Sequence, residues 1–265
     1  VLSAETKAEL KCAIRPAAWR GVPILPCGRG TSLSGQTVAA AIVIDFSKYM
    51  NRILDIDTAQ RLVRIEPGVV LDQLNAALQP HGLQFGPDVS TGNRAAIGGM
   101  IGNNSAGSRS VRQGKTIDHV RALEVILADG TLLKCCPIDA DTLAHKQALP
   151  NIEGEIYRCI PEIVDAVREE IIDKYPRILR RVSGYNLDAF VPELQSEIPI
   201  AAAAAELNAR WPDREDFNLA KLIVGAEGTL GTVVEAVVHT VPLPKQRAVA
   251  CLQFRSIDSA LKIIT

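Results

Sequence analysis

The sequence predicts an α+β fold. Apolar residues recur at helical spacing in residues 6–21 and 69–82, whereas residues 22–26 and 40–46 are continuous apolar runs of strand length. An Asp-Gly pair also separates two extended runs in residues 119–135, a pattern typical of two strands joined by a tight turn. Helices and strands therefore alternate along one chain.

The first half of the chain begins with a helix that contains Pro16. We expect this proline to kink or interrupt the helix, because it cannot donate the backbone hydrogen bond of a helix interior. After the two apolar strands, residues 61–68 alternate as a strand does and precede the second helix. Residues 86–116 are rich in glycine, asparagine and serine and are expected to form a long loop, which in a compact domain is usually functional.

The second half continues after the Asp-Gly turn with a helical segment at residues 153–175, which Pro161 should separate into two pieces. The alanine run at 201–205 favours a helix. Residues 221–244 predict a strand, a glycine turn and a second strand that ends at prolines, and residues 248–254 begin another element.

Composition restricts the class of protein. The 265 residues are 47% hydrophobic, enough for a substantial core, and 29 basic against 30 acidic side chains leave a net charge of −1, so we expect no nucleic-acid partner. No apolar run is long enough to span a bilayer. The six cysteines form no CxxC pair and no histidine cluster accompanies them, so we expect no metal site and reduced thiols. Without a signal or transit peptide, a cytoplasmic location is expected.

Two glycine-rich stretches are candidate ligand sites. In "PILPCGRGTSLSGQ", residues 23–36, the glycine spacing and the strand that follows exclude a Rossmann fingerprint, but the stretch could be a plain turn or an anion-binding nest of backbone N–H groups. "IGGMIGNNSAG", residues 97–107, could admit a flat ligand or be a compact Ω-loop. The "GKT" at 114–116 lacks the upstream glycine of a P-loop.

No proton-transfer group stands out in the chain. A G-x-S-x-G nucleophile elbow is absent from the sequence, and the four histidines are scattered without metal spacing: His81, His119, His145 and His239. These absences fit a protein whose fold serves a cofactor. The chain starts without methionine and stops where a helical pattern has only begun, so we expect a fragment of a longer polypeptide.

Four stretches in order resemble one family: "PILPCGRGTSLSG", "GPDVSTGNRAAIGGMIGNNSAG" with "GKTIDHVRALEVILADGT", "RRVSGYNLDAF", and "FNLAKLIVGAEGTLGTVVEAVVHTVPLP". They are similar to the FAD-binding domain of the FAD-linked oxidases of the vanillyl-alcohol oxidase / p-cresol methylhydroxylase type, in the branch of glycolate oxidase, D-lactate dehydrogenase and D-2-hydroxyglutarate dehydrogenase. The resemblance covers residues 1–245. It implies a two-subdomain FAD-binding fold, with subdomain 1 and its pyrophosphate loop at 1–66, an antiparallel-sheet subdomain 2 at 67–245, and only the start of a truncated cap (substrate) domain at 246–265.

The resemblance also implies which residues bind FAD. The first phosphate loop falls on Cys27, Gly28, Arg29, Gly30, Thr31 and Ser32, with Gly35 at its exit. The segment along the ribityl chain and isoalloxazine ring falls on Pro87, Asp88, Thr91, Ile97, Gly98, Gly99, Asn103, Ser105 and Gly107. Val120 falls on the adenine side, and the pocket closes around the adenosine and pyrophosphate at Gly228 and Val233. Because neither loop holds a histidine, we expect noncovalent FAD. At Cys27, relatives often carry a basic or other polar residue.

The function implied by the resemblance is oxidation of a D-2-hydroxy acid, of the lactate, glycolate or 2-hydroxyglutarate class, by hydride transfer to flavin N5, with electrons passed to a non-nicotinamide acceptor. Catalytic residues are expected in the missing cap and C-terminal region, as is any iron–sulfur cluster, so the isolated chain should be inactive. Arg180, Arg181 and Tyr185 could border the substrate site, although a solvated basic face is the simpler interpretation. The full-length enzyme could lie at the inner face of a membrane. Alternatives are a sugar or aromatic-alcohol substrate, or a non-catalytic nucleotide-binding module.

Overall fold

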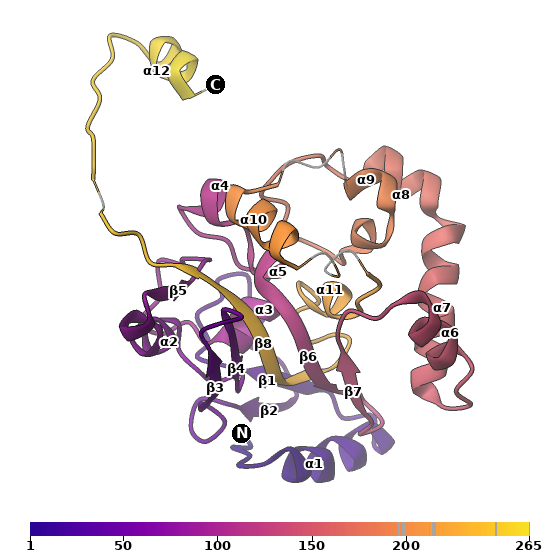
Figure 1. The fold of residues 1–265 in the computed structure, drawn as a ribbon. Coiled ribbons are helices and arrows are strands. Elements are labelled where there is room, and N and C mark those ends of the chain that lie inside the picture. Colours follow the sequence, from indigo (N-terminus) through magenta and orange to yellow (C-terminus); the bar gives the residue numbers. More distant parts are fainter. Residues whose placement is uncertain (196, 198–199, 212, 214–215, 247, 265) are drawn as a thin grey trace.

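The computed structural model describes residues 1–195, 197, 200–211, 213, 216–246 and 248–264 (Figure 1). Its main feature is a six-stranded sheet in which the order β3-β4-β8-β6-β7 is completed by β5, which also pairs with β8. Every pairing in this sheet is antiparallel. The strands are β3 Ile53–Asp57, β4 Leu62–Ile65, β5 Leu83–Phe85, β6 Val120–Ile126, β7 Leu132–Cys135 and β8 Thr232–Pro242.

Strand β8 holds the sheet together. It lies between β4 and β6, with Ile65 opposite Ala236 and Leu123 opposite the same residue on the other side. Its even-numbered side chains Val234, Ala236 and Val238 are almost completely buried. Because an inner strand with a buried face has one favoured register, β8 fixes the alignment of its neighbours.

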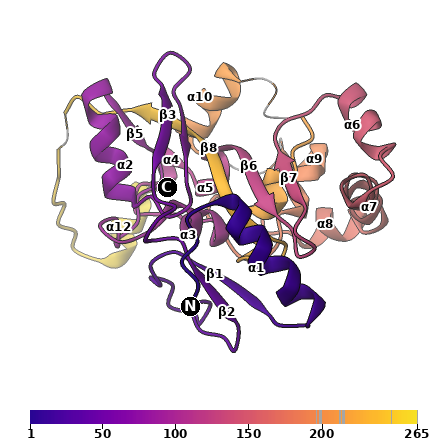
Figure 2. The same ribbon diagram turned by 90° about the horizontal axis from the view of Figure 1, so that it is seen from below.

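A second, two-stranded sheet lies at one end of the molecule together with the first helix (Figures 1 and 2). Strands β1, Ile24–Cys27, and β2, Ile42–Asp45, run parallel, and helix α1, Lys7–Trp19, packs Leu10 and Ile14 into the same apolar cluster as Ile44. Ile126 and Val234 of the large sheet belong to this cluster too, so apolar packing joins the two sheets.

Of the two effects expected of Pro16, a kink or an interruption, the interruption does not occur, because α1 continues through the proline. The proline lies in the last turn, and the residue whose carbonyl loses its helical donor, Cys12, is exposed to solvent. Pro161 likewise lies inside a helix, α7 Ile152–Ala166, and the break comes at Val167, before α8 Arg168–Lys174. The carbonyl of Tyr157, one turn before Pro161, accepts a hydrogen bond from the Gln147 amide at 3.2 Å instead, which compensates for the missing donor.

Three further expectations need correction. Residues 86–116 are not one loop, because they contain α3 Ile97–Gly102 and α4 Ser110–Gln113, and α5 Thr116–His119 begins at their end. The first expected strand of 221–244 is instead the short helix α11 Ala220–Ile223. Residues 248–254, which were expected to begin another element, form neither a helix nor a strand. The alanine run does lie in a helix, α10 Ala202–Arg210.

The remaining helices lie around the sheet. Helix α2 Leu71–Leu78 follows β4, and α6 Ala140–Gln147 lies with α7 and α8 beyond the β7 edge (Figures 1 and 2). Helix α9 is Pro192–Gln195. The last helix, α12 Ile257–Ile264, lies apart from the rest of the molecule (Figure 1). Among the described helices, none has the length and apolar character needed to cross a bilayer.

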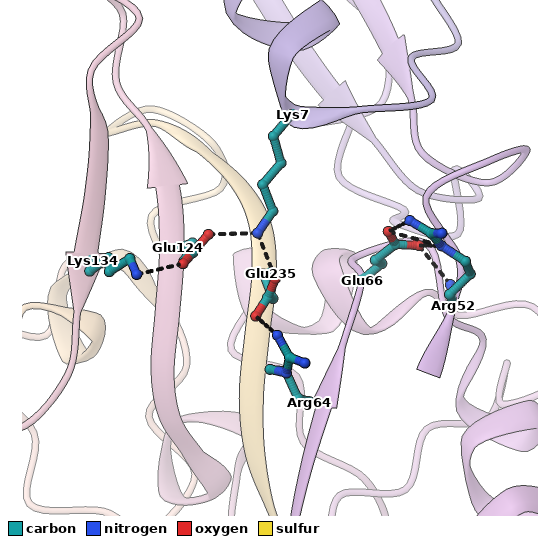
Figure 3. Close-up of polar contacts among 7 residues, drawn as sticks. All are labelled: Lys7, Arg52, Arg64, Glu66, Glu124, Lys134 and Glu235. Atoms are coloured by element: carbon teal, nitrogen blue, oxygen red, sulfur yellow. Dashed lines mark hydrogen bonds and ion pairs between the residues drawn. The ribbon is translucent and has the colours of Figure 1, made fainter. Parts of the chain in front are cut away.

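A group of ion pairs fastens α1 to the large sheet (Figure 3). Glu124 of β6 and Glu235 of β8 lie directly opposite each other in register, where two carboxylates would repel. Lys7 Nζ bridges them, 2.6 Å from Glu124 Oε2 and 2.5 Å from Glu235 Oε2. Burial lowers the pKa of Lys7, but the hydrogen bonds that its ammonium donates to both carboxylates outweigh burial, and the net pKa is raised. The ammonium therefore stays charged at neutral pH.

Candidate functional site

A cavity lies where four chain segments meet: the loop after β1, the residues just after β2 and β4, the segment around α3, and the turn before β8. It is lined by small and apolar side chains with few charges. Within the described residues that line it, Arg29 is the one with a basic side chain and Glu227 the one with a carboxyl group. Such a cavity, lined by backbone and small side chains, suits a large ligand with a flat ring and a charged linker.

The first wall of the cavity is the loop that follows β1. Gly30 adopts φ +63°, in the left-handed region that turns successive N–H groups to one side of the chain. Among the described residues, no acceptor is found for the backbone N–H groups of four residues in this loop: Gly28, Arg29, Thr31 and Ser32. Unpaired amides at a cavity wall form a binding site for an anion such as a diphosphate.

Cys27 precedes this loop and lines the cavity. Burial raises the pKa of its thiol and Asp45 raises it further, while a hydrogen bond from the Gly30 N–H acts in the opposite direction. The net pKa is above the ordinary value, so the thiol is neutral at pH 7. Cys27 therefore places no negative charge beside the unpaired amides.

The second wall is α3 with the residues after it. Asn103 Nδ2 donates to Ser32 Oγ at 2.7 Å, which joins this wall directly to the first loop. Gly28 lies so close to α3 that a Cβ on it would be 2.8 Å from the Cβ of Ala96. At Gly99, by contrast, a Cβ would meet no protein atom within 4 Å, so this face of α3 is open to the cavity.

The third wall is the turn between α11 and β8. The N–H groups of Gly225 and Glu227 donate to the carbonyls of Ile101 and Gly102, at 2.9 and 3.0 Å, and thereby anchor the turn on the end of α3. Glu227 and Gly228 both have positive φ, +53° and +81°, and a Cβ on Gly228 would be 3.3 Å from Pro26. The turn therefore closes against the end of β1.

Comparison with known proteins identifies the architecture. Residues 1–136 match the family model described as "FAD binding domain". The chain belongs to this FAD-binding domain family. It is 38% identical over 246 residues to the D-2-hydroxyglutarate dehydrogenase of Pantoea ananatis (strain AJ13355), covering 93% of the chain but 22% of that protein. It is 28% identical over 246 residues to glycolate oxidase subunit GlcD of Bacillus subtilis (strain 168), covering 92% of the chain and 37% of that protein.

Among solved structures, the FAD-binding domain resembles alkyldihydroxyacetonephosphate synthase, with a TM-score of 0.56 and 18% identity over 92% of this chain and 32% of that one. This likeness confirms the predicted fold class, a mixed helix-and-sheet FAD-binding fold. The chain spans about a quarter of the dehydrogenases it matches and a third of the synthase.

The residues of the cavity fit FAD. The unpaired amides of the first loop suit its diphosphate, and the open face above Gly99 suits a flat ring. Gln36, which also lines the cavity, has a buried side-chain oxygen without a hydrogen-bond partner, and a bound ligand with a donor group would satisfy it. None of the four histidines, all in the described part of the chain, lines this cavity.

The structure brings most of the expected FAD-binding residues of the domain to this cavity: Cys27, Gly28, Arg29, Gly30, Thr31, Ser32, Thr91, Gly98, Gly99, Asn103, Ser105, Gly228 and Val233. The other expected residues lie outside its lining: Gly35, Pro87, Asp88, Ile97, Gly107 and Val120. Lining residues that the sequence did not single out include Gln36, Thr37, Phe46, Pro67, Ala96, Met100, Glu227 and Leu230. Of these, Pro67 could have been suspected, because it follows an alternating strand in "IEPG".

Asp88 and Gly107 hold the second wall in place rather than line the cavity. The Asp88 carboxylate accepts hydrogen bonds from Ser108 Oγ at 2.9 Å and from the backbone and side chain of Arg109 at 3.1 and 3.0 Å. Burial raises the pKa of Asp88, but these donors outweigh it and the net pKa is lowered. The carboxylate ties the loop before α3 to the loop after it.

Asp88→Asn is expected to lower the free energy of unfolding at pH 7, because the charged acceptor is lost. The folded-state pKa is below that of the unfolded chain, so this stabilisation is complete above about pH 4 and is lost as the pH falls through the folded-state pKa. Urea unfolding of both proteins between pH 3 and pH 7 measures this effect. The difference in unfolding free energy between the two proteins should narrow toward pH 3. A difference that stays constant with pH would contradict the stabilising role of the Asp88 carboxylate.

Arg181 is not on a solvated basic face, contrary to the simpler interpretation of the sequence. Its guanidinium is buried in an ion pair with Asp188, with side-chain exposures of 12% and 8%, and also donates to Asn186 Oδ1 at 3.2 Å. Arg180 is exposed. Tyr185 Oη lies 2.9 Å from Thr229 Oγ1, next to the third wall of the cavity.

Asp188→Asn is expected to cost about 3 kcal/mol of unfolding free energy, because it leaves the Arg181 charge buried without its carboxylate. A matched control is Asp165→Asn, which removes the more distant of the two carboxylates that pair with Arg168, at 3.5 Å and with 74% of its side chain exposed, and leaves the Glu193 pair in place. Its cost should not exceed about 0.5 kcal/mol. Denaturant unfolding of both variants tests the contrast, and equal losses would show that the Arg181 pair is no stronger than a surface pair.

Proposed function

We propose that this chain binds FAD noncovalently in the cavity and is the flavin domain of an oxidoreductase that acts on a D-2-hydroxy acid of the lactate, glycolate or 2-hydroxyglutarate class. The observation that carries the cofactor assignment is the row of unpaired backbone amides in the first loop, held by Asn103 against the second wall. The names of the relatives, a D-2-hydroxyglutarate dehydrogenase and a glycolate oxidase subunit, support the substrate class.

In this proposal the residues of the chain bind and orient the cofactor. The first loop holds the diphosphate, α3 supports the ring at Gly99, and the Gly228 turn covers the adenosine side. When bound, the flavin supplies the hydride acceptor at N5 and passes electrons to a non-nicotinamide acceptor. The groups that remove the substrate proton and hold its carboxylate are expected outside residues 1–265, as is any iron–sulfur cluster.

The cofactor assignment is tested by adding excess FAD to the purified protein, removing the unbound flavin and recording the visible spectrum. We expect a bound flavin spectrum with quenched or shifted fluorescence, and release of intact FAD into the supernatant on acid denaturation. The absence of flavin absorbance after reconstitution would contradict the assignment. Flavin that stays with the denatured protein would contradict the noncovalent mode.

The substrate class is tested in the whole protein as its gene encodes it, by anaerobic addition of D-lactate, glycolate or D-2-hydroxyglutarate to the oxidised flavoprotein. We expect one of these acids to bleach the flavin absorbance. Bleaching only by a sugar or aromatic alcohol would favour the first alternative. Equal affinity for ADP and FAD without bleaching by any of these would favour a nucleotide-binding module.

The cytoplasmic location stays a prediction from the sequence, and fractionation of the cells tests it.

A further inference from the structure

A three-residue segment, Glu66-Pro67-Gly68, follows β4 and lies between two walls of the cavity. It continues the pairing of β3 with β4 beyond the strands: after Ile53 opposite Ile65, the Glu66 N–H donates to the Arg52 carbonyl at 3.0 Å. The Gly68 N–H then donates to the Met50 carbonyl at 2.8 Å. The segment is thus fixed to residues 50–52, which lead from β2 into β3.

This segment touches the first wall through the backbone of Phe46. The Phe46 N–H donates to the Cys27 carbonyl at 3.1 Å, directly before the first glycine loop. The Phe46 carbonyl then presses against Gly68, where a Cβ would be 2.1 Å from the oxygen. Because φ of Gly68 is not positive, glycine is needed here for space rather than for conformation.

On its other side the segment touches the second wall. The Gly98 N–H, at the start of α3, donates to the Pro67 carbonyl at 2.8 Å. A Cβ on Gly98 would be 2.6 Å from the Cβ of Pro67, so ring and helix are in direct contact. A continuous series of backbone contacts therefore runs from Cys27 through Phe46, the Glu66-Pro67-Gly68 segment and Gly98, and it joins the two walls in addition to their direct contacts at Gly28 and Ser32.

The Glu66 side chain holds this segment in place (Figure 3). This side chain is 6% exposed, and its carboxylate accepts hydrogen bonds from the Arg52 backbone N–H at 2.8 Å and from the Arg52 guanidinium at 2.7 Å. A buried carboxylate needs such charge-assisted donors, and the guanidinium fork fixes its orientation. Arg52 itself is 67% exposed, so the pair reaches from solvent to the cavity wall.

We propose that Glu66 is a positioning residue for the cofactor: anchored by Arg52, it holds Pro67 and Gly68 so that the two glycine-rich walls keep the separation that FAD needs. Glu66 does not line the cavity and acts through Pro67, which does. This inference rests on the proposed binding of FAD in the cavity. It adds to that proposal the element that sets the width of the site.

The test is Glu66→Gln, which keeps the shape of the side chain and removes its charge. We expect FAD binding to weaken about tenfold, because a neutral amide accepts the Arg52 hydrogen bonds more weakly than the carboxylate does, and the looser anchor displaces Pro67 at the cavity wall. We also expect a changed visible circular dichroism of the flavin at saturating FAD, measured well below the melting temperature. The second readout reports the geometry of the site in protein that is already folded and loaded.

The matched control is Glu153→Gln, which breaks the ion pair with Lys146, at 2.5 Å, on the helices beyond β7 and away from the cavity. It should lower stability without altering the FAD dissociation constant or the flavin spectrum. Arg52→Lys is the second test variant, since its exposed side chain makes misfolding an improbable outcome; it should shift both readouts in the same direction as Glu66→Gln. In the double variant the two effects on affinity should be less than additive, because both act on one interaction.

These measurements distinguish a failure of the proposed FAD binding from a failure of the positioning role of Glu66. If the unaltered protein does not bind FAD, the proposed function itself fails. If the unaltered protein binds FAD and either Glu66→Gln or Arg52→Lys binds it with the same affinity and the same flavin spectrum, the positioning role of Glu66 is overturned. Loss of stability in Glu66→Gln together with unchanged binding and spectrum would likewise assign Glu66 a structural role only.

Discussion

Gly99→Ala is expected to weaken FAD binding about tenfold or more while leaving the folded protein intact. A Cβ at this position meets no protein atom within 4 Å and projects into the cavity, so the conflict arises only with a bound ligand. A steric cost of about 1.4 kcal/mol is sufficient for a tenfold effect. The free energy of unfolding without FAD should be unchanged or raised by up to about 1 kcal/mol, because alanine favours a helix over glycine.

Gly98→Ala, one residue earlier in α3, is the matched comparison. Its Cβ would lie 2.6 Å from the Cβ and 2.9 Å from the carbonyl oxygen of Pro67, so the conflict is within the protein. This variant should lose about 1–3 kcal/mol of stability even without FAD. Flavin titration and urea unfolding of the two variants separate the effects, and Gly99→Ala with unaltered FAD affinity would place the cofactor elsewhere.

Gly107→Ala is expected to lower the free energy of unfolding by about 3 kcal/mol, whether or not FAD is present. A Cβ on Gly107 would be 1.2 Å from the backbone oxygen of Asp88 and 2.3 Å from its carbonyl carbon. Backbone atoms cannot move aside as the end of a flexible side chain can. The loops before and after α3 would therefore have to separate, and the hydrogen bonds to the Asp88 carboxylate would be lost with them.

Urea unfolding measures this loss, with Gly102→Ala as the control. A Cβ on Gly102 comes no closer than 3.8 Å to the Glu227 Cα, an ordinary contact, so its effect on the protein without FAD should stay within about 0.5 kcal/mol. Equal stability of Gly107→Ala and Gly102→Ala would show that the approach of Gly107 to Asp88 is not as tight as the structure has it.

The sequence was most informative where a local pattern determines the local structure. The Asp129-Gly130 turn between β6 and β7 forms as predicted, with Gly130 at φ +85°. The glycine-rich stretches also come together in space, although nothing in their spacing alone required it. That expectation came from the resemblance of their joint order to FAD-linked oxidases, since a single glycine loop is compatible with many structures.

Other features could not be predicted because they depend on tertiary contacts that no local sequence pattern specifies. Pro161 is tolerated inside a helix since Gln147 supplies a donor from another helix, and Arg181 is buried since Asp188 folds back onto it. Strand β3 carries no strong alternating pattern of its own and is defined by its pairing with β4. Pro67 was not singled out either: its position after an alternating strand is visible in the sequence, but only the fold places it between the two glycine-rich walls.

The position of β8 in the sheet has a consequence for the order of events during synthesis. The cavity's third wall immediately precedes β8, and β8 is also the strand that pairs with both β4 and β6. A nascent chain that has emerged only as far as α10 has both glycine-rich walls but neither the strand that aligns them nor the turn that covers them. We therefore expect flavin capture to be a late step. It awaits the pairing of β4 with β8, which joins the residues farthest apart in sequence among the described strand pairs, Leu62 with His239, and such non-local pairing is slow to form.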